Sequence, residues 1–168
     1  MSDQLSVYLV RHAIAEQRGS DWPDDTQRPL TSRGAARFRQ VVAGLAAMGV
    51  SIDEILTSPL VRAQQTADLL AQGLTGDPKV VGLPALAPDG SLKALLDEIT
   101  ARADRETLAL VGHEPGIGAL AARLTGGSVP FAFKKGAICR IDFTRPVRVT
   151  EGRLSWFAPP RLLRRLGE

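Results

Sequence analysis

Short apolar segments of β-prone residues alternate with segments of helical periodicity, and this alternation constrains the fold more than any other feature of the chain. Apolar residues at helical spacing occupy the intervals, most clearly at Phe38, Val41, Val42 and Leu45. Alternating strands and helices predict an α/β fold with a largely parallel sheet and helices on both faces. The predicted strands cover residues 5–10, 52–57, 79–83, 107–111, 137–143 and 153–157.

The composition indicates one globular domain over residues 1–168, because no repeat and no Ser- or Pro-rich linker divides the chain. The 21 basic residues are spread along the sequence against 18 acidic ones, which does not indicate a nucleic-acid partner. The longest apolar stretch, residues 41–50, is too short to span a bilayer. Cys139 is the only cysteine, which excludes an internal disulfide and favours a reducing compartment. We therefore expect a cytoplasmic monomer with no membrane contact.

The chain has two histidines, and each lies two positions past the last residue of a predicted strand. His12 comes after residues 5–10 and Arg11, and His113 comes after residues 107–111 and Gly112. Ligands of open α/β sheets bind beyond the carboxyl ends of the strands, so we expect both rings at one edge of the sheet.

Two arginines are predicted to join the histidines at that edge. Arg11 precedes His12 in the sequence. Ser58 and Pro59 are typical of an N-cap and of the first position of a helix, which places Arg62 in the first turn. An arginine opposes the helix dipole there unless an anion binds between the guanidinium and the free N–H groups. The alternative is that both arginines are solvated surface residues.

Two histidines and two arginines together suit phosphoryl transfer without a metal or cofactor. A neutral imidazole is a good nucleophile toward phosphorus, and neighbouring guanidinium groups lower its pKa. The same groups bind phosphate oxygens and neutralise their charge, a role that Mg²⁺ has in many kinases. The sequence has neither a His-Glu-x-x-His motif nor a cysteine pair for zinc.

Three ordered motifs resemble those of the histidine phosphatase superfamily, which includes the phosphoglycerate mutases. Residues 9–13 (LVRHA) are similar to its Arg-His-Gly signature, residues 57–67 to its second arginine segment, and residues 110–116 to its second histidine segment. The similarity to the SixA-type phosphohistidine phosphatases extends over nearly the whole chain, including residues 28–31 and 156–163.

This resemblance implies a three-layer α/β/α sandwich like that of phosphoglycerate mutase and a phosphatase that needs no metal or cofactor. His12 would be the nucleophile that forms a phosphohistidine intermediate, and Arg11, Arg62 and His113 would hold the phosphoryl group. Arg28 would contact substrate at the edge of the pocket, or would instead anchor its loop through a carboxylate such as Asp25. The implied partner is a phosphorylated signalling or phosphotransfer protein of the histidine phosphotransfer type.

Two departures from the superfamily pattern affect these expectations. Ala13 stands where the signature has glycine, which is acceptable if the backbone there avoids positive φ. Larger members carry a glutamate as general acid in the region that corresponds to residues 83–90. Here the only carboxylate in that region is Asp89, a residue typical of a turn. An imidazole leaves a phosphorus atom more readily than an alkoxide does, so a pocket without a dedicated acid favours P–N bonds over ordinary esters.

Other functions remain open from the sequence. The substrate could instead be a sugar or nucleotide phosphate, or the chain could bind phosphoproteins without turnover, although His12 favours an enzyme. Cys139 and Arg145 have the spacing of cysteine-based phosphatases, but the residues between them alternate like a strand. Gly116 and Gly118 fit a dinucleotide-binding fingerprint, although close packing of a helix on the sheet explains them equally well.

Overall fold

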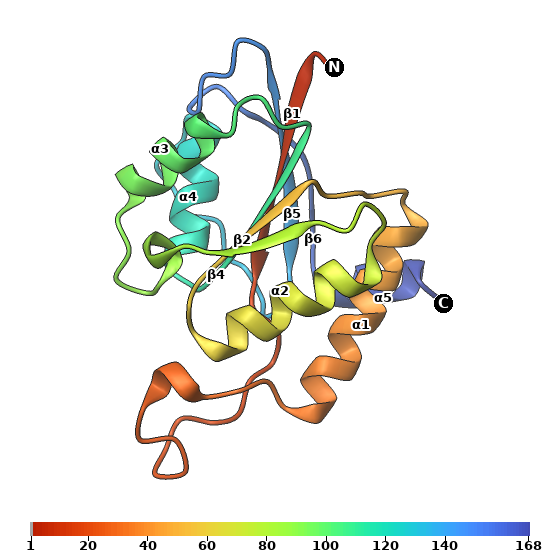
Figure 1. Ribbon diagram of the computed structural model, residues 1–168, viewed down its shortest axis with the longest axis vertical. Coiled ribbons are helices and arrows are strands. Elements are labelled where there is room, and N and C mark those ends of the chain that lie inside the picture. The colour runs from red at the N-terminus through yellow and green to blue at the C-terminus, as the bar shows by residue number, and fades with distance from the viewer. Residues whose placement is uncertain (1) are drawn as a thin grey trace.

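Six strands form one mixed sheet in the computed structural model, which describes residues 2–168 (Figure 1). Their order across the sheet is β3-β2-β4-β1-β5-β6. The strands are β1 (Gln4–Arg11), β2 (Glu54–Thr57), β3 (Lys79–Gly82), β4 (Thr107–Gly112), β5 (Ile138–Thr144) and β6 (Arg153–Ala158). The helices are α1 (Ser32–Ala47), α2 (Val61–Gly73), α3 (Leu92–Ala101), α4 (Gly116–Leu124) and α5 (Pro160–Leu166), with short 3-10 helices η1 (Asp25–Gln27) and η2 (Pro84–Leu86) in the loops.

The first four strands are parallel to one another, and the last two are antiparallel to their neighbours. β4 pairs with β1 and β2, and β2 pairs with β3, all in parallel. β5 pairs antiparallel with β1, and β6 pairs antiparallel with β5. Parallel neighbours need a crossover, which α1, α2 and α3 supply, whereas a short loop over residues 145–152 joins β5 and β6 and suits antiparallel pairing. The predicted α/β class with a largely parallel sheet is confirmed.

Helices cover both faces of this sheet, as predicted. α1, α2 and α5 pack on one face, and α3 and α4 pack on the other (Figure 1). The side of α1 that faces the sheet carries apolar residues at positions i, i+3, i+4 and i+7. These residues are almost completely buried, and they are Phe38, Val41, Val42 and Leu45. Successive strand residues such as Leu9 and Val10 enter different core clusters, because their side chains point to opposite faces.

The basic C-terminal segment forms α5 and packs against α1. Leu163 of α5 is buried, whereas Arg161 and Arg165 are exposed. A Cβ atom at Gly44 of α1 would lie 1.9 Å from the carbonyl oxygen of Leu163, so only glycine permits this close approach of the two helices. Within residues 2–168, no helix has the length and apolar character needed to cross a membrane.

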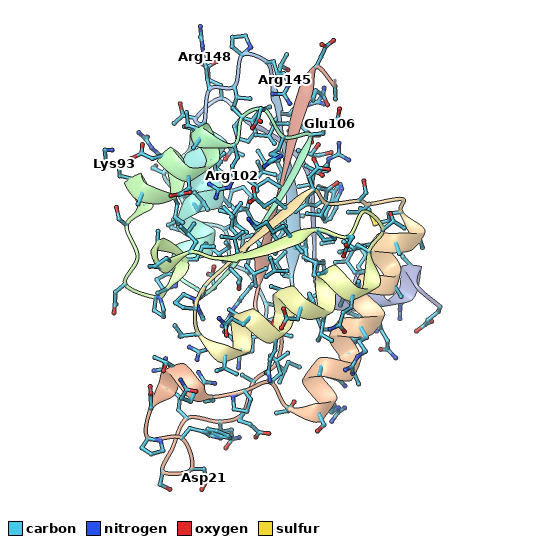
Figure 2. The ribbon with its side chains drawn as sticks, viewed as in Figure 1. Asp21, Lys93, Arg102, Glu106, Arg145 and Arg148 are labelled. Atoms are coloured by element: carbon cyan, nitrogen blue, oxygen red, sulfur yellow. The ribbon has the colours of Figure 1, made fainter. Side chains whose placement is uncertain are left out.

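The carboxyl ends of the four parallel strands lie at one edge of the sheet, where the long loop between β1 and α1 begins (Figure 1). Figure 2 shows Asp21 at the tip of this loop, with Arg145 and Arg148 at the opposite end of the molecule. Arg102 also lies away from the loop, and its Nε donates to the carboxylate of Glu54 at the start of β2 (2.9 Å). The carboxyl ends of β1 and β4, which the two histidines follow, thus lie at the loop end of the molecule.

Candidate active site

The two histidines lie side by side at the carboxyl edge of the sheet. Arg11 of β1 is in register with Gly112 of the parallel strand β4, so His12 and His113 continue two neighbouring strands. The His12 amide donates to the carbonyl of Gly112 (3.0 Å), and the centroids of the two rings are 5.1 Å apart. Both side chains are buried. Parallel pairing thus brings together two residues that are far apart in the sequence.

A cavity of about 400 Å³ opens beside these rings and is strongly cationic. All five residues proposed from the sequence line it, namely Arg11, His12, Arg28, Arg62 and His113. Arg18 and Lys135 add two further positive charges, and Glu16 and Glu114 are the carboxylates in the wall. The excess of positive charge favours an anionic ligand. This space is called the phosphate pocket below.

Three buried side-chain nitrogens of this pocket have no hydrogen-bond partner within the protein. They are Nε of Arg11, Nε of Arg62 and Nδ1 of His113, and within residues 2–168 they are the only buried side-chain nitrogens or oxygens in that state. Buried polar groups are almost always paired, and a guanidinium N–H can only donate. All three belong to residues that line one cationic pocket, which points to an oxyanion as the ligand.

The ring of His12 is held in the tautomer that leaves Nε2 free. Its Nδ1 lies 2.7 Å from the carbonyl oxygen of Ala13, and because a carbonyl only accepts, Nδ1 carries the proton. The pKa of His12 is lowered to about 3, mainly by burial and also by His113, Arg62 and Arg11, while the hydrogen bond to Ala13 acts in the opposite direction. His12 is therefore neutral at pH 7, with a lone pair on Nε2. Ala13 has no positive φ, so its methyl group fits as expected.

The ring of His113 is oriented by Ser58, a residue that the sequence reasoning had assigned only to a helix cap. The predicted cap is wrong, because α2 begins at Val61 and Leu60 is its N-cap. The Ser58 hydroxyl instead accepts from the amide of Leu60 (3.2 Å) and lies 2.8 Å from Nε2 of His113. The Ser58 side chain is fully buried, so its hydroxyl proton needs an acceptor within the protein. Because the hydroxyl oxygen already accepts from Leu60, the hydroxyl donates its own proton to Nε2 of His113. The His113 proton then lies on Nδ1, the ring nitrogen that has no hydrogen-bond partner within the protein.

Replacing Ser58 with alanine is expected to mix the two tautomers of His113 and to lower kcat/KM about tenfold, as for one lost hydrogen bond. Because the chain has only two histidines, their ¹⁵N imidazole spectra separate cleanly in NMR. Ser6→Ala is the matched control, since Ser6 is another buried serine but lies near the amino end of β1 and bonds to Asp142 of β5 (2.8 Å). Unchanged His113 spectra in Ser58→Ala would contradict the assigned tautomer.

Asp25 holds two of the arginines in place. Arg62 is almost fully buried and donates to both the carbonyl oxygen (2.9 Å) and the carboxylate (3.0 Å) of Asp25, which leaves its Nε free. Arg28 donates to the same carboxylate (2.8 Å) and to the carbonyl of Glu16 (2.6 Å). Partial burial opposes ionisation of Asp25, but Arg28, Arg62 and Arg18 outweigh it and lower its pKa. Arg28 thus anchors its loop through Asp25 and also lines the pocket.

The motifs for other activities occupy structural positions. Cys139 is completely buried in β5, and burial raises the pKa of its thiol to about 12, so it is no nucleophile. Arg145 binds backbone carbonyls at the opposite end of the sheet, including that of Arg105 (2.7 Å). A Cβ atom at Gly118 would lie 2.0 Å from the carbonyl of Phe131, so close packing explains this glycine. Within residues 2–168, no group of three or more His, Cys, Asp or Glu side chains is placed to hold a metal ion.

A family model, curated relatives and solved structures that are similar to this chain agree with one another. The model of branch 1 of the histidine phosphatase superfamily matches residues 7–87. An uncharacterized protein of Picosynechococcus sp. strain PCC 7002 is 41% identical over 73% of this chain and 74% of its own. The phosphohistidine phosphatase SixA of Escherichia coli K12 is 31% identical over 82% of this chain and 84% of its own. A solved structure of the protein histidine phosphatase SixA in complex with tungstate has a TM-score of 0.85 at 27% identity, covering 95% of this chain and 99% of the other.

Proposed function

The chain belongs to the histidine phosphatase superfamily as a SixA-like phosphatase, and from this membership we propose that it removes the phosphoryl group from phosphohistidine in a protein. The observation that carries the proposal is the pair of buried rings 5.1 Å apart in a pocket with unpartnered arginine nitrogens. Tungstate, bound in the solved SixA structure, is a tetrahedral oxyanion like phosphate. Two relatives that match most of the chain carry the name phosphohistidine phosphatase.

In the first step, the Nε2 lone pair of His12 attacks the phosphorus atom of the substrate. A new N–P bond forms at His12, and the N–P bond to the substrate imidazole breaks, with its electron pair leaving on that nitrogen. The substrate ring that carries a proton on its other nitrogen leaves as neutral imidazole and needs no further proton. The bond from Nδ1 to Ala13 fixes the ring so that Nε2 faces the pocket throughout (2.7 Å). A positioned neutral nucleophile of this kind needs no general base.

In the second step, a water molecule attacks the phosphorus atom carried by His12. The O–P bond forms as the N–P bond to His12 breaks, which releases inorganic phosphate and restores the neutral ring. In both steps Nε of Arg11, Nε of Arg62 and Nδ1 of His113 donate to the phosphoryl oxygens. These donors are already fixed in a partly enclosed pocket, so they stabilise the charge of the transition state without reorganising. The charge is neutralised without a metal ion.

The phosphohistidine substrate is supported by the character of the leaving group. Asp89, the carboxylate nearest in sequence to the acid of larger members, is exposed in a turn and does not line the pocket. One carboxylate oxygen of Glu114, which does line the pocket, accepts from the amide of Gly118 (2.9 Å). A stable imidazole leaving group has the least need of a proton donor, which favours a P–N bond over an alcohol ester.

The proposal is tested with the purified protein in EDTA, on a peptide with one phosphohistidine and on the same peptide with phosphoserine. We expect kcat/KM to be about 10²-fold or more higher for the phosphohistidine peptide, with no loss on chelation. Equal rates on both peptides, or a higher rate on sugar or nucleotide phosphates, would retain the chemistry and overturn the substrate. Binding of the phosphopeptide without release of phosphate would instead identify a phosphoprotein-binding module.

A further inference from the structure

A second cavity of about 150 Å³ lies next to the phosphate pocket and differs from it in character. His113 and Pro88 line both cavities, so the two spaces adjoin at these two residues. Apart from His113, every residue of the smaller cavity is apolar or glycine. Its walls come from the segment between η2 and α3, from the end of β4 and from α4.

Backbone hydrogen bonds and close packing hold one wall of this apolar cavity in place. Successive turns close the segment between η2 and α3, with the amide of Ala87 donating to Pro84 (3.0 Å) and that of Gly90 donating to Ala87 (2.9 Å). A Cβ atom at Gly90 would lie 1.8 Å from the carbonyl oxygen of Ala85, so this segment is folded tightly on itself. A Cβ atom at Gly116, on the opposite wall, meets nothing within 4 Å. The space between the walls is therefore available to a ligand.

The size and chemistry of this cavity define what it would accept. A cavity of about 150 Å³ with apolar walls is large enough for a group the size of benzene and binds ordered water poorly. The charged groups of the phosphate pocket, by contrast, exclude apolar parts of a substrate. A substrate that fills both spaces carries its phosphoryl group on one side of His113 and a compact apolar group on the other.

We propose that the apolar cavity binds a hydrophobic side chain that neighbours the phosphohistidine of the substrate protein. This inference rests on the proposed function, because it takes the phosphoryl donor to be a protein. The cavity would then supply the recognition that a phosphoryl group alone cannot, since all phosphoproteins share that group. Leu92, which is 36% exposed at the start of α3, extends the apolar surface of the cavity toward solvent.

The test uses two short peptides with one phosphohistidine each, flanked by leucines in one and by serines in the other, together with phosphoramidate. Phosphoramidate has a P–N bond but no organic group. We expect the protein to prefer the leucine peptide about tenfold in kcat/KM. Ala119→Leu, which fills the cavity from α4, is expected to abolish this preference and to leave phosphoramidate hydrolysis within about twofold of its original rate.

Two further variants complete the test. Ala46→Leu makes the same substitution on the exposed side of α1 and should retain the preference. Leu92→Asn adds no volume and should also weaken it, so the inference does not depend on one substitution. No preference in the original protein, a preference that persists in both cavity variants, or an equal fall on all three substrates would overturn the inference. Failure of the original protein to hydrolyse any P–N substrate would overturn the proposed function itself.

Discussion

Replacing His12 with asparagine is expected to lower kcat on phosphohistidine peptides by at least about 10³-fold, because it removes the ring nitrogen proposed to attack phosphorus. Asparagine is of similar size, and its amide N–H can still donate to the carbonyl of Ala13, which His12 Nδ1 contacts at 2.7 Å. The variant should therefore fold. Steady-state release of phosphate, together with the thermal unfolding midpoint, measures both effects.

The cations that bind phosphate are unchanged in His12→Asn, so its affinity for inorganic phosphate should stay within about tenfold of the original value. This binding measurement separates loss of the nucleophile from loss of the pocket. A variant that binds phosphate and retains more than about a tenth of the original kcat would show that another group, or water itself, attacks phosphorus.

Replacing Arg62 with glutamine should lower kcat/KM by about 10²- to 10³-fold, the usual cost of removing one fixed donor from a transition state. Arg62→Lys should be nearly as impaired, because one ammonium group does not reproduce the two bonds to Asp25 together with a third donor toward the phosphoryl group. Both variants are compared by steady-state kinetics on the phosphohistidine peptide. Asp25 is partly exposed, so it stays hydrated when its partner is lost.

Arg102→Gln is the matched control for the Arg62 variants. Arg102 likewise pairs with carboxylates, here Glu54 and Glu98, but it lies at the other end of β2 from the phosphate pocket. The control should keep kcat/KM within about twofold. Loss of activity in Arg102→Gln as large as that in Arg62→Gln would indicate a general effect on the fold and would contradict the role proposed for Arg62.

Much of the fold was predictable because each strand is a local signal in the sequence. The apolar segments around Leu9 and Leu110 identified two strands, and the rule for open α/β sheets then placed the residues that follow them at one edge. Strand direction was harder to predict at the C-terminal end, where β5 and β6 are antiparallel to their neighbours. The length of the connection determines that direction, and a pattern of apolar residues does not report it.

The parts of the site that escaped prediction depend on contacts between distant segments. Serine before proline is a common cap signal and predicts a helix cap at Ser58, yet the Ser58 hydroxyl lies against His113, 55 positions away. The sequence suggests Asp25 as a partner of Arg28, but its bond to Arg62 across 37 positions has no local signal. The apolar cavity can be predicted only when the path of the segment between η2 and α3 is known, and that segment has no periodic pattern. The spacing of residues along the sequence therefore predicts neither of these two contacts and does not predict the cavity.

The most direct test of phosphoryl transfer to His12 is to react the protein briefly with a phosphohistidine peptide, quench it in alkali and locate the phosphoryl group by mass spectrometry. Trypsin cleavage separates the two histidines, since His12 lies in residues 12–18 and His113 lies in residues 106–123. We expect the mass of one phosphoryl group on residues 12–18 alone. A phosphoryl group on residues 106–123, or none on either peptide while phosphate is being released, would contradict His12 as the nucleophile.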